Sequence, residues 1–570
     1  MKAAYFNYST ILCILLAGCS ARMHRQPWSA SESTFHRAAV AADHPVASQA
    51  GLEILRKGGN AVDAAVAISF TLSVVRPESC GLGGGGFMVI HAPTADGISP
   101  IQKAIIYREQ CPATVEPLHY VQLEDNQASR FGYHASGVPG TVAGLLHVLD
   151  TYGTLDRSTV MAPAIRAAER GFAADQRYIK GRSHAREEMP GRNLGPLWND
   201  GSENIPSVGQ IVHNRDQARA LRLIERDGAD AFYRGEIGQA IVSLMQNKGG
   251  TLSNADLVSY RVRSVAPVRG KFQGHEILAM PPPSSGGVAL LQMFGMLELR
   301  YKEIQSQPPL SPNYVHMVAE MMKHAFADRS EWLADSEFVD VPIDMLLDRA
   351  YVESRGRLIS EKSTHAPDHY GSRHVIPEDG GTSHFSVIDA DGMAVACTET
   401  INLEYGSLTV VPGYGFCLNN QMDDFTTQPG EANAFGLTQS TRNSPQPGKR
   451  PLSSMSPTIV LKNGRPIIIA GASGGPRIIT STFQCILNCL LHDMNAGQSV
   501  ASPRFHHQWM PNRLYLEDGT GAGLSRPLKR FGHETEQTNS VGNVQLIFVD
   551  DRGIIHAASD PRKGGVPAGY

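Results

Sequence analysis

The alternation of apolar and polar positions is clearest in the last third of the chain. Over residues 382–389, and again over 393–400, apolar side chains recur at every second position. Asp391-Gly392 lies between the two runs, and this dipeptide is typical of tight hairpin turns. The pattern predicts a β-hairpin that begins at Thr382, directly after the flexible pair Gly380-Gly381.

The rest of this C-terminal part is predicted to form short strands and one helix. Alternating runs predict strands at 456–461, 466–469 and 543–548. Apolar residues at helical spacing predict a helix over 478–491. Pro476, just before it, suits an early helical position, where its missing N–H costs nothing.

Before residue 360 the spacing of apolar residues is mainly helical. Residues 38–75 are dense in Ala, Val, Leu and Ile, and Gly58-Gly59-Asn60 is expected to divide them into two helices. Three further segments share this helical spacing: 135–180, 215–265 and 313–332. Residues 360–381 are polar and rich in His, Pro and Gly, which predicts an exposed connector. The mixture indicates a layered α/β or α+β architecture.

Composition indicates a folded globular protein. Of its 570 residues, 42% are hydrophobic and 19% charged, and the net charge is −4. A near-neutral chain without a long basic run lacks the positive face that duplex binding needs, so nucleic acid is not expected as a main partner.

The first residues predict export. Lys2 precedes a short apolar run at 11–17, which is too short to span a bilayer and is typical of a secretory signal. The sequence LAGC, ending at Cys19, resembles a bacterial lipoprotein box, in which the cysteine is acylated. The alternative is a plain signal peptide cut a little later. We therefore expect an exported, periplasmic protein that is soluble or anchored by lipid.

Two patterns that suggest cofactors are set aside. Gly81, Gly83 and Gly86 match G-x-G-x-x-G, but here the strand follows the glycines, whereas dinucleotide binding needs a strand before them. Close backbone packing, or a turn lining a pocket, is the favoured role. His506-His507 lacks a metal-binding helix signature, so structural histidines are favoured. Six scattered cysteines beyond the signal region do not form a disulfide framework.

The stretch ASGGPRIIT, residues 472–480, has the features of an anion site. Gly474 and Gly475 precede the predicted helix and can present bare N–H groups at its positive end. Donors in this arrangement suit an oxyanion hole.

Seven short motifs in one order carry a resemblance to a known family. They are YREQCPA, GGTSHFSVID, LNNQMDDF, KRPLSSMSPTIV, ASGGPRIIT, PRFHHQW and the terminal ASDPR…GY. Over roughly residues 36–570 the chain resembles the γ-glutamyltranspeptidases, also called glutathione hydrolases, of the N-terminal-nucleophile hydrolase superfamily. The resemblance implies an α+β fold, a four-layer αββα sandwich without metal or cofactor. After the signal segment (1–19), it also implies two subunits, 20–381 and 382–570, that are cut from one precursor and share one core.

The resemblance assigns the catalytic groups. The precursor is expected to cut itself between Gly381 and Thr382, which frees an α-amine with a pKa near 8 that can act as the base. Thr400 matches the threonine that supports the nucleophile. Gly474 and Gly475 match the oxyanion donors.

The resemblance also assigns a grip on the two charged ends of a glutamyl group. Arg108 matches the carboxylate clamp, with Ser453 and Ser454 as hydroxyl donors to the same group. Three residues match the positions that bind the α-amine: Asn402, Gln421 and Asp424. Arg108 and Asp424 are expected on opposite walls of the pocket.

Two positions depart from the family pattern. Residues 429–449 match a lid loop, but Phe435 stands where a tyrosine is common, which leaves the closing hydrogen bond in doubt. Cys111 replaces an alanine near the clamp, either as packing or as an oxidisable thiol.

The activity implied is transfer of a γ-glutamyl group from glutathione or related compounds to water, an amino acid or a peptide. One alternative is a cephalosporin acylase that acts on glutaryl side chains, and another is an uncleaved protein that binds γ-glutamyl ligands without turnover. The sequence leaves the balance of hydrolysis and transpeptidation open.

Overall fold

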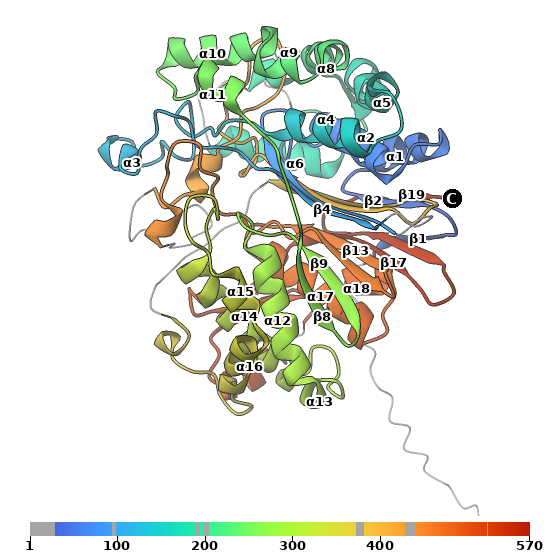
Figure 1. The fold of residues 1–570 in the computed structure, drawn as a ribbon, viewed down its shortest axis with the longest axis vertical. Helices are drawn as coiled ribbons and strands as arrows, with labels where there is room; N and C mark the ends of the chain where they lie inside the picture. Colours follow the sequence, from blue (N-terminus) through green and yellow to red (C-terminus); the bar gives the residue numbers. More distant parts are fainter. Residues whose placement is uncertain are drawn as a thin grey trace, which may run out of the picture.

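Two seven-stranded antiparallel sheets lie face to face at the centre of the molecule, and helices cover the outer face of each (Figure 1). The computed structural model describes residues 29–93, 99–188, 194–198, 205–371, 381–427, 440–520 and 523–570. The layers run helix, sheet, sheet, helix, which confirms the predicted αββα class of α+β fold.

The first sheet has the strand order β19-β2-β10-β11-β3-β4-β7. Its strands are β19 (Ala568–Gly569), β2 (Ala39–Ala42), β10 (Thr382–Ile388), β11 (Ala394–Thr400), β3 (Gly85–Ala92), β4 (Ile101–Tyr107) and β7 (Arg263–Val265). Two strands from the last third of the chain therefore lie between strands from its first hundred residues.

The second sheet also combines strands from distant parts of the chain, in the order β1-β18-β17-β13-β12-β9-β8. Its strands are β1 (Ser31–Phe35), β18 (Ile555–Ser559), β17 (Asn543–Val549), β13 (Arg465–Ser473), β12 (Thr458–Lys462), β9 (His275–Ala279) and β8 (Val268–Phe272). A three-stranded sheet, β14 (Phe505–His506), β15 (Leu514–Glu517) and β16 (Thr535–Thr538), and the pair β5 (Phe172–Ala173) and β6 (Ile211–Val212) lie outside the sandwich.

The two outer layers are built from different helices (Figure 1). The first sheet is covered by α1 (Pro45–Arg56), α2 (Ala61–Val75) and α4 (Thr141–Tyr152), with α5 (Arg157–Arg170), α8 (Arg215–Asp227), α9 (Ala229–Tyr233) and α10 (Glu236–Lys248) beyond them. The second is covered by α12 (Gly286–Leu299), α17 (Arg477–Leu491) and α18 (Ala496–Ala501), with α14 (Pro312–Trp332) and α16 (Arg349–Leu358) packed on α12. The apolar cores follow these layers, one around the sheet interface and α12, α14 and α17, the other beneath α2, α4 and α5.

The predicted hairpin is confirmed. β10 and β11 pair in register from Thr382 opposite Thr400, and Gly392 in the turn adopts φ +83°. Phe385 and Val395 pack toward the outer helices, as their alternation predicts. The intervening polar positions are also buried, because they face the second sheet: Ser386 Oγ donates to the carbonyl of Ile469 at 3.1 Å.

The prediction that residues 38–75 begin as a helix is wrong at its start. Residues Ala39–Ala42 form β2, which pairs with β10 and β19. A strand that is buried on both faces shows no alternation of apolar and polar residues, so its composition resembles that of a buried helix. The break at Gly58-Gly59-Asn60 is confirmed, because Asn60 caps α2 through its side chain.

The other predicted elements are largely confirmed. The helices expected at 313–332 and 478–491 are α14 and α17, and the expected strands are β12, β13 and β17. Residues 215–265 are helical up to α11 (Asn254–Ser259) and end in β7. Part of the expected connector, 372–380, lies outside the described residues, as do the signal segment and Cys19. Among the helices that are described, none has the length and apolarity of a membrane span.

Candidate active site

Thr382 opens β10 and lies within a small hydrogen-bonded group at the end of the first sheet. Its Oγ1 is 3.2 Å from Oγ1 of Thr400, the residue opposite it on β11. Thr400 Oγ1 donates to the carbonyl oxygen of Gly381 at 2.6 Å and accepts from the backbone N–H of Asn402 at 2.8 Å. Because the single hydroxyl proton of Thr400 is used on Gly381, Thr382 is the donor in the contact between the two threonines.

Gly381 has no room for a side chain. A Cβ at this position would lie 2.3 Å from the carbonyl oxygen of Glu78 and 3.0 Å from Cα of Ser79. Packing against this neighbouring backbone therefore requires glycine before Thr382. The contact with Glu78 thus gives a structural reason for glycine at the expected cleavage site.

Gly474 and Gly475 form the turn between β13 and α17, with φ angles of +134° and +50°. Arg477 and Ile478 donate their backbone N–H groups to the carbonyls of these two glycines, which directs the chain into the helix. The turn thus lies at the positive end of a 15-residue helix, where a negative charge is favoured.

Arg108 follows β4 and is fully buried. Its Nη2 forms an ion pair with Oδ2 of Asp424, which also accepts from Gln421 Nε2 at 2.7 Å. The expectation that Arg108 and Asp424 lie on opposite walls is wrong for this structure. Within this buried site the two opposite charges neutralise one another directly, because the surrounding protein screens them poorly.

Burial affects the acidic groups around this ion pair. It raises the pKa of the Asp424 carboxyl, an effect that Arg108 opposes. It also raises the pKa of Glu109 to about 7, although the guanidinium of Arg108 is 3.7 Å away. The neighbouring Asp423 faces elsewhere and accepts from Ser129 Oγ at 2.6 Å.

Nine of the ten residues predicted to be catalytic or substrate-binding line a single cavity of about 30 Å³. They are Arg108, Thr382, Thr400, Asn402, Gln421, Asp424, Ser453, Ser454 and Gly475. Gly474 immediately precedes this set but does not line the cavity. Residues separated by more than 350 positions in the sequence thus meet at one site.

Arg329 lines the same cavity and was missed by sequence reasoning. It lies on α14, is 2% exposed, and donates from Nε to Ser285 Oγ at 2.9 Å and from Nη2 to Ser454 Oγ at 3.4 Å. Burial lowers its pKa to about 10, against the opposing effect of Asp424. No motif marks it, and a charged residue on a helix is usually exposed.

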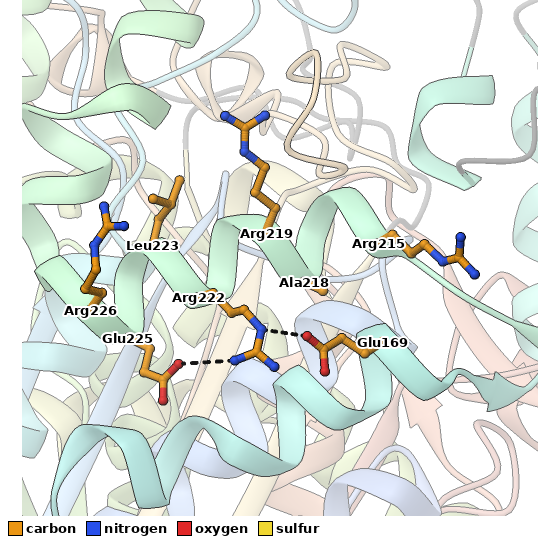
Figure 2. Close-up of a pocket in the computed structure, with 8 residues that line it drawn as sticks. All are labelled: Glu169, Arg215, Ala218, Arg219, Arg222, Leu223, Glu225 and Arg226. Atoms are coloured by element: carbon orange, nitrogen blue, oxygen red, sulfur yellow. Dashed lines mark hydrogen bonds and ion pairs between the residues drawn. The ribbon is translucent and has the colours of Figure 1, made fainter.

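A wider hollow of about 650 Å³ lies over α8 (Figure 2). Arg222 projects between Glu169 and Glu225 there, at 2.6 and 3.9 Å. Arginine, glutamate, alanine and leucine side chains line this hollow, and it contains none of the predicted site residues. It offers no nucleophile.

The patterns that were set aside have structural roles. The glycine run packs against backbone: a Cβ at Gly83 would lie 2.2 Å from the carbonyl oxygen of Cys417. His506 contacts Thr480 Oγ1 and Gln508 Oε1, both at 2.8 Å. Cys111 is 2% exposed and packs in an apolar cluster, which favours packing over oxidation. All six cysteines of the described residues are buried and free.

One cluster of three ligand-type side chains occurs elsewhere in the described part of the chain. Potential ligand atoms of His316, Glu320 and His533 lie within 4.8 Å of one another. However, His316 Nδ1 already contacts His533 Nε2 at 2.8 Å, and the ammonium of Lys323 lies 3.1 Å from Glu320. The neighbouring positive charge disfavours a cation at this position.

Phe435 and most of the expected lid, residues 428–439, lie outside the described residues. Residues 440–449 are described. Lys449 Nζ donates to the carbonyl of Ser444 at 3.1 Å, and Gly448 N donates to the carbonyl of Cys111 at 2.9 Å. The end of the expected lid is thus tied to the segment that follows Arg108.

Comparison with known proteins gives one consistent family. The family model described as γ-glutamyltranspeptidase matches residues 47–570. The glutathione hydrolase proenzyme of Escherichia coli (strain K12) is 35% identical over 588 residues, covering 100% of both chains. The acylase ACY 1 proenzyme of Pseudomonas sp. (strain SE83) is 35% identical, covering 94% of this chain and 93% of its own length.

Solved structures show the same relationship. The cephalosporin acylase of Bacillus halodurans superposes with a TM-score of 0.81 at 25% identity, covering 95% of this chain and 98% of its own. A chain of the γ-glutamyltranspeptidase of Helicobacter pylori gives a TM-score of 0.54 at 36% identity, covering 58% of this chain and 93% of its own.

Proposed function

Since this chain belongs to the γ-glutamyltranspeptidase family, we propose that it is a self-cleaving enzyme that transfers γ-glutamyl groups from glutathione and related compounds, with Thr382 as its nucleophile. The observation that carries the proposal is the contact of Thr400 with both Thr382 Oγ1 and the carbonyl of Gly381, in one cavity with Arg108 and Asp424.

The first reaction is cleavage of the chain. Thr382 Oγ1 attacks the carbonyl carbon of Gly381, the C–N bond breaks, and the acyl group moves to oxygen as the α-amine takes a proton. Water then hydrolyses the ester, leaving Gly381 as a carboxylate and Thr382 as a new N-terminus. The hydroxyl of Thr400 already donates a hydrogen bond to the Gly381 oxygen, and it stabilises the negative charge that develops on that oxygen.

The second reaction is turnover. The free α-amine accepts the Thr382 hydroxyl proton as Oγ1 attacks the γ-carbonyl of the donor, and the leaving amine takes that proton. Gly474 and Gly475 N–H groups hold the oxyanion of this intermediate. Water, or the amine of an amino acid or peptide acceptor, then releases the glutamyl group from its ester with Thr382.

Recognition of the glutamyl group uses both members of the ion pair. Arg108, with Ser453 and Ser454, binds the donor α-carboxylate, while Asp424 and Gln421 bind its α-amine and Asn402 supports them. Gln421 Oε1 and Arg108 Nη1 have no hydrogen-bond partner within the described residues, so each has capacity for a ligand. A zwitterionic donor replaces one ion pair by two, with no net loss of charge pairing.

The second candidate is a glutaryl acylase, favoured by the similarity to the cephalosporin acylase and to ACY 1. A glutaryl group has no α-amine, so Asp424 would lose its pairing with Arg108 and gain nothing in return. This argument ranks the γ-glutamyl donor first. A binding protein that is never cleaved is the third candidate.

Export and maturation complete the proposal. We expect residues 1–19 to direct the chain to the periplasm, with Cys19 acylated if the lipoprotein box is used. The mature enzyme is then a heterodimer of a large subunit that ends at Gly381 and a small subunit, 382–570.

The test is the intact mass of the purified wild-type protein beside Thr382→Ala. A fragment that begins at Thr382, present only in the wild type, supports the nucleophile, and a single uncut wild-type chain contradicts it. Hydrolysis of γ-glutamyl-p-nitroanilide by the wild type, compared with glutaryl-p-nitroanilide, then separates transpeptidase from acylase. A cut enzyme that prefers the glutaryl compound would overturn the proposed substrate.

A further inference from the structure

Lys563, seven residues before the C-terminus, lies outside the cavity and contacts the backbone of Thr382. Its Nζ donates to the backbone carbonyl of Thr382 and lies 3.4 Å from Ser383 Oγ and 3.3 Å from Ser473 Oγ. Its side chain is 2% exposed. Lys563 does not line the substrate cavity, so these contacts are to the protein and leave the donor untouched.

Asp43 fixes the position of this ammonium group. Asp43 Oδ2 lies 2.7 Å from Lys563 Nζ, and its Oδ1 accepts from Gln545 Nε2 at 2.7 Å. The guanidinium of Arg76 donates to the backbone carbonyls of both Asp43 and Lys563, at 3.1 and 3.4 Å. The charge is thus held at one point relative to Thr382, because strands from both sheets restrain it.

We propose that Lys563 is a positioning residue for γ-glutamyl transfer, whose charge keeps the α-amine of cleaved Thr382 unprotonated and ready to act as the base. The inference rests on the proposed function. The carbonyl oxygen that Lys563 contacts belongs to the same residue as the amine, so bond geometry sets the two nitrogens within about 6 Å. A positive charge at that range disfavours a second positive charge on the amine.

The contact with Ser473 gives Lys563 a second positioning role. Ser473 is the last residue of β13, directly before the Gly474-Gly475 turn. One ammonium group therefore connects the start of β10 to the segment that carries the oxyanion donors. The nucleophile and those donors are held in fixed relative positions without any contact to substrate.

Asp43 offsets part of the charge of Lys563, and seven other ionisable groups lie around Thr382. They are Glu78, Cys80, Arg108, Arg329, His384, Glu399 and Asp424. Burial lowers the pKa of His384 to about 3, raises that of Glu399 to about 7, and keeps the Cys80 thiol protonated. Arg108 and Asp424 offset one another. Arg329 lies in the substrate cavity and reinforces the effect of Lys563 on the amine.

The experiment is the pH profile of kcat/KM for γ-glutamyl-p-nitroanilide, measured on the mature two-chain enzyme after its cleavage is verified by mass. In Lys563→Met the acid limb is expected to move upward by about one pH unit, which lowers kcat/KM about tenfold below the limb. Activity recovers at higher pH, and KM stays close to that of the wild type. Lys563→Arg keeps the charge and is expected to restore the limb.

Asp43→Asn supplies a test of opposite sign. It removes the carboxylate that offsets Lys563, so the acid limb is expected to move downward, and this variant keeps the residue that contacts Thr382. A uniform loss of kcat/KM over the whole pH range in Lys563→Met, with no movement in Asp43→Asn, would overturn the proposal. If the cleaved wild type does not hydrolyse the γ-glutamyl substrate, the proposed function fails first, whatever the variants do.

Discussion

The hydroxyl of Thr400 donates to the carbonyl oxygen of Gly381 at 2.6 Å while its oxygen lies 3.2 Å from the hydroxyl of Thr382. One side chain thus contacts both atoms whose charge changes if Thr382 attacks the preceding peptide. The strand pairing of Thr382 with Thr400 creates this arrangement, so it is present before any bond is broken.

Replacing Thr400 with valine tests this relationship. The shape is kept and a β-branched residue suits the strand, but the donor to Gly381 is lost. Self-cleavage is expected to slow by about 10²- to 10³-fold, the usual cost of removing one oxyanion donor. A time course of chain cleavage by mass spectrometry measures this. Thr398→Val is the matched control. The hydroxyl of Thr398 contacts His384 and not Gly381, so this variant is expected to cleave itself at the wild-type rate.

Gly381→Ala is expected to stop cleavage through packing alone. The added methyl group meets the carbonyl of Glu78, so the scissile peptide must move, at a cost of about 1–3 kcal/mol in unfolding free energy. Gly81→Ala changes the loop that contains Glu78, at a position where a Cβ meets nothing within 4 Å, and this variant should cut and unfold as the wild type does. Equal cleavage in both variants would contradict the packing argument.

Arg108→Lys is expected to cleave normally but to bind donor weakly. A lysine keeps the charge but loses the fork that reaches Asp424 and the carbonyls of Pro451 and Leu452 together. The loss of kcat/KM is expected to be about 10- to 100-fold, mostly through KM. A wild-type KM in this variant would show that Arg108 does not bind the donor.

Arg329→Met should separate stability from activity. Within the described residues, the hydrogen-bond partners of this buried guanidinium are two hydroxyls, and burial lowers its pKa to about 10. Replacing it with an apolar side chain of similar length removes a desolvation cost, so the melting temperature is expected to rise while KM for the donor increases. A lower melting temperature with unchanged KM would show a structural role instead.

Buried histidines predict a loss of stability in acid. Both ring nitrogens of His324 lack partners within the described residues, and burial lowers its pKa from 6.5 to about 3. The unfolded chain therefore binds more protons between pH 6.5 and 3, and stability falls as the pH falls through that window.

His324→Phe should remove the proton that His324 takes up when the chain unfolds in acid. Lowering the pH from 6.5 to 5 would then cost about 1.5–2 kcal/mol less than in the wild type, as measured by urea unfolding at the two pH values. The same pH dependence in both proteins would contradict a neutral, buried His324.

The sequence predicted well wherever local pattern and tertiary structure agree. The hairpin at Thr382 was predicted because its alternation matches its outward packing, whereas the contact of Gly381 with Glu78 is seen only in the folded chain. β2 was mistaken for helix because five consecutive apolar residues, all buried, show no alternation with polar ones.

Residues that act through tertiary contacts alone gave no signal in the sequence. Arg329 lies on a regular helix, and Lys563 lies in a turn near the C-terminus; only the folded chain brings them to Thr382. The direct pairing of Arg108 with Asp424 was also missed, since motif order gives the members of a site but not their contacts.

Because β10 and β11 lie between β2 and β3, the chain is expected to fold before it is cut, and the cut protein is not expected to refold. Folding as one chain is an intramolecular search, whereas the two products of a cut before Thr382 would have to find each other in solution and thread strands into two sheets at once. The uncut peptide bond is therefore needed while the two sheets form, and it is not needed to keep the folded structure together. A mature enzyme that is once unfolded should stay unfolded on cooling, even though its uncut Thr382→Ala counterpart refolds.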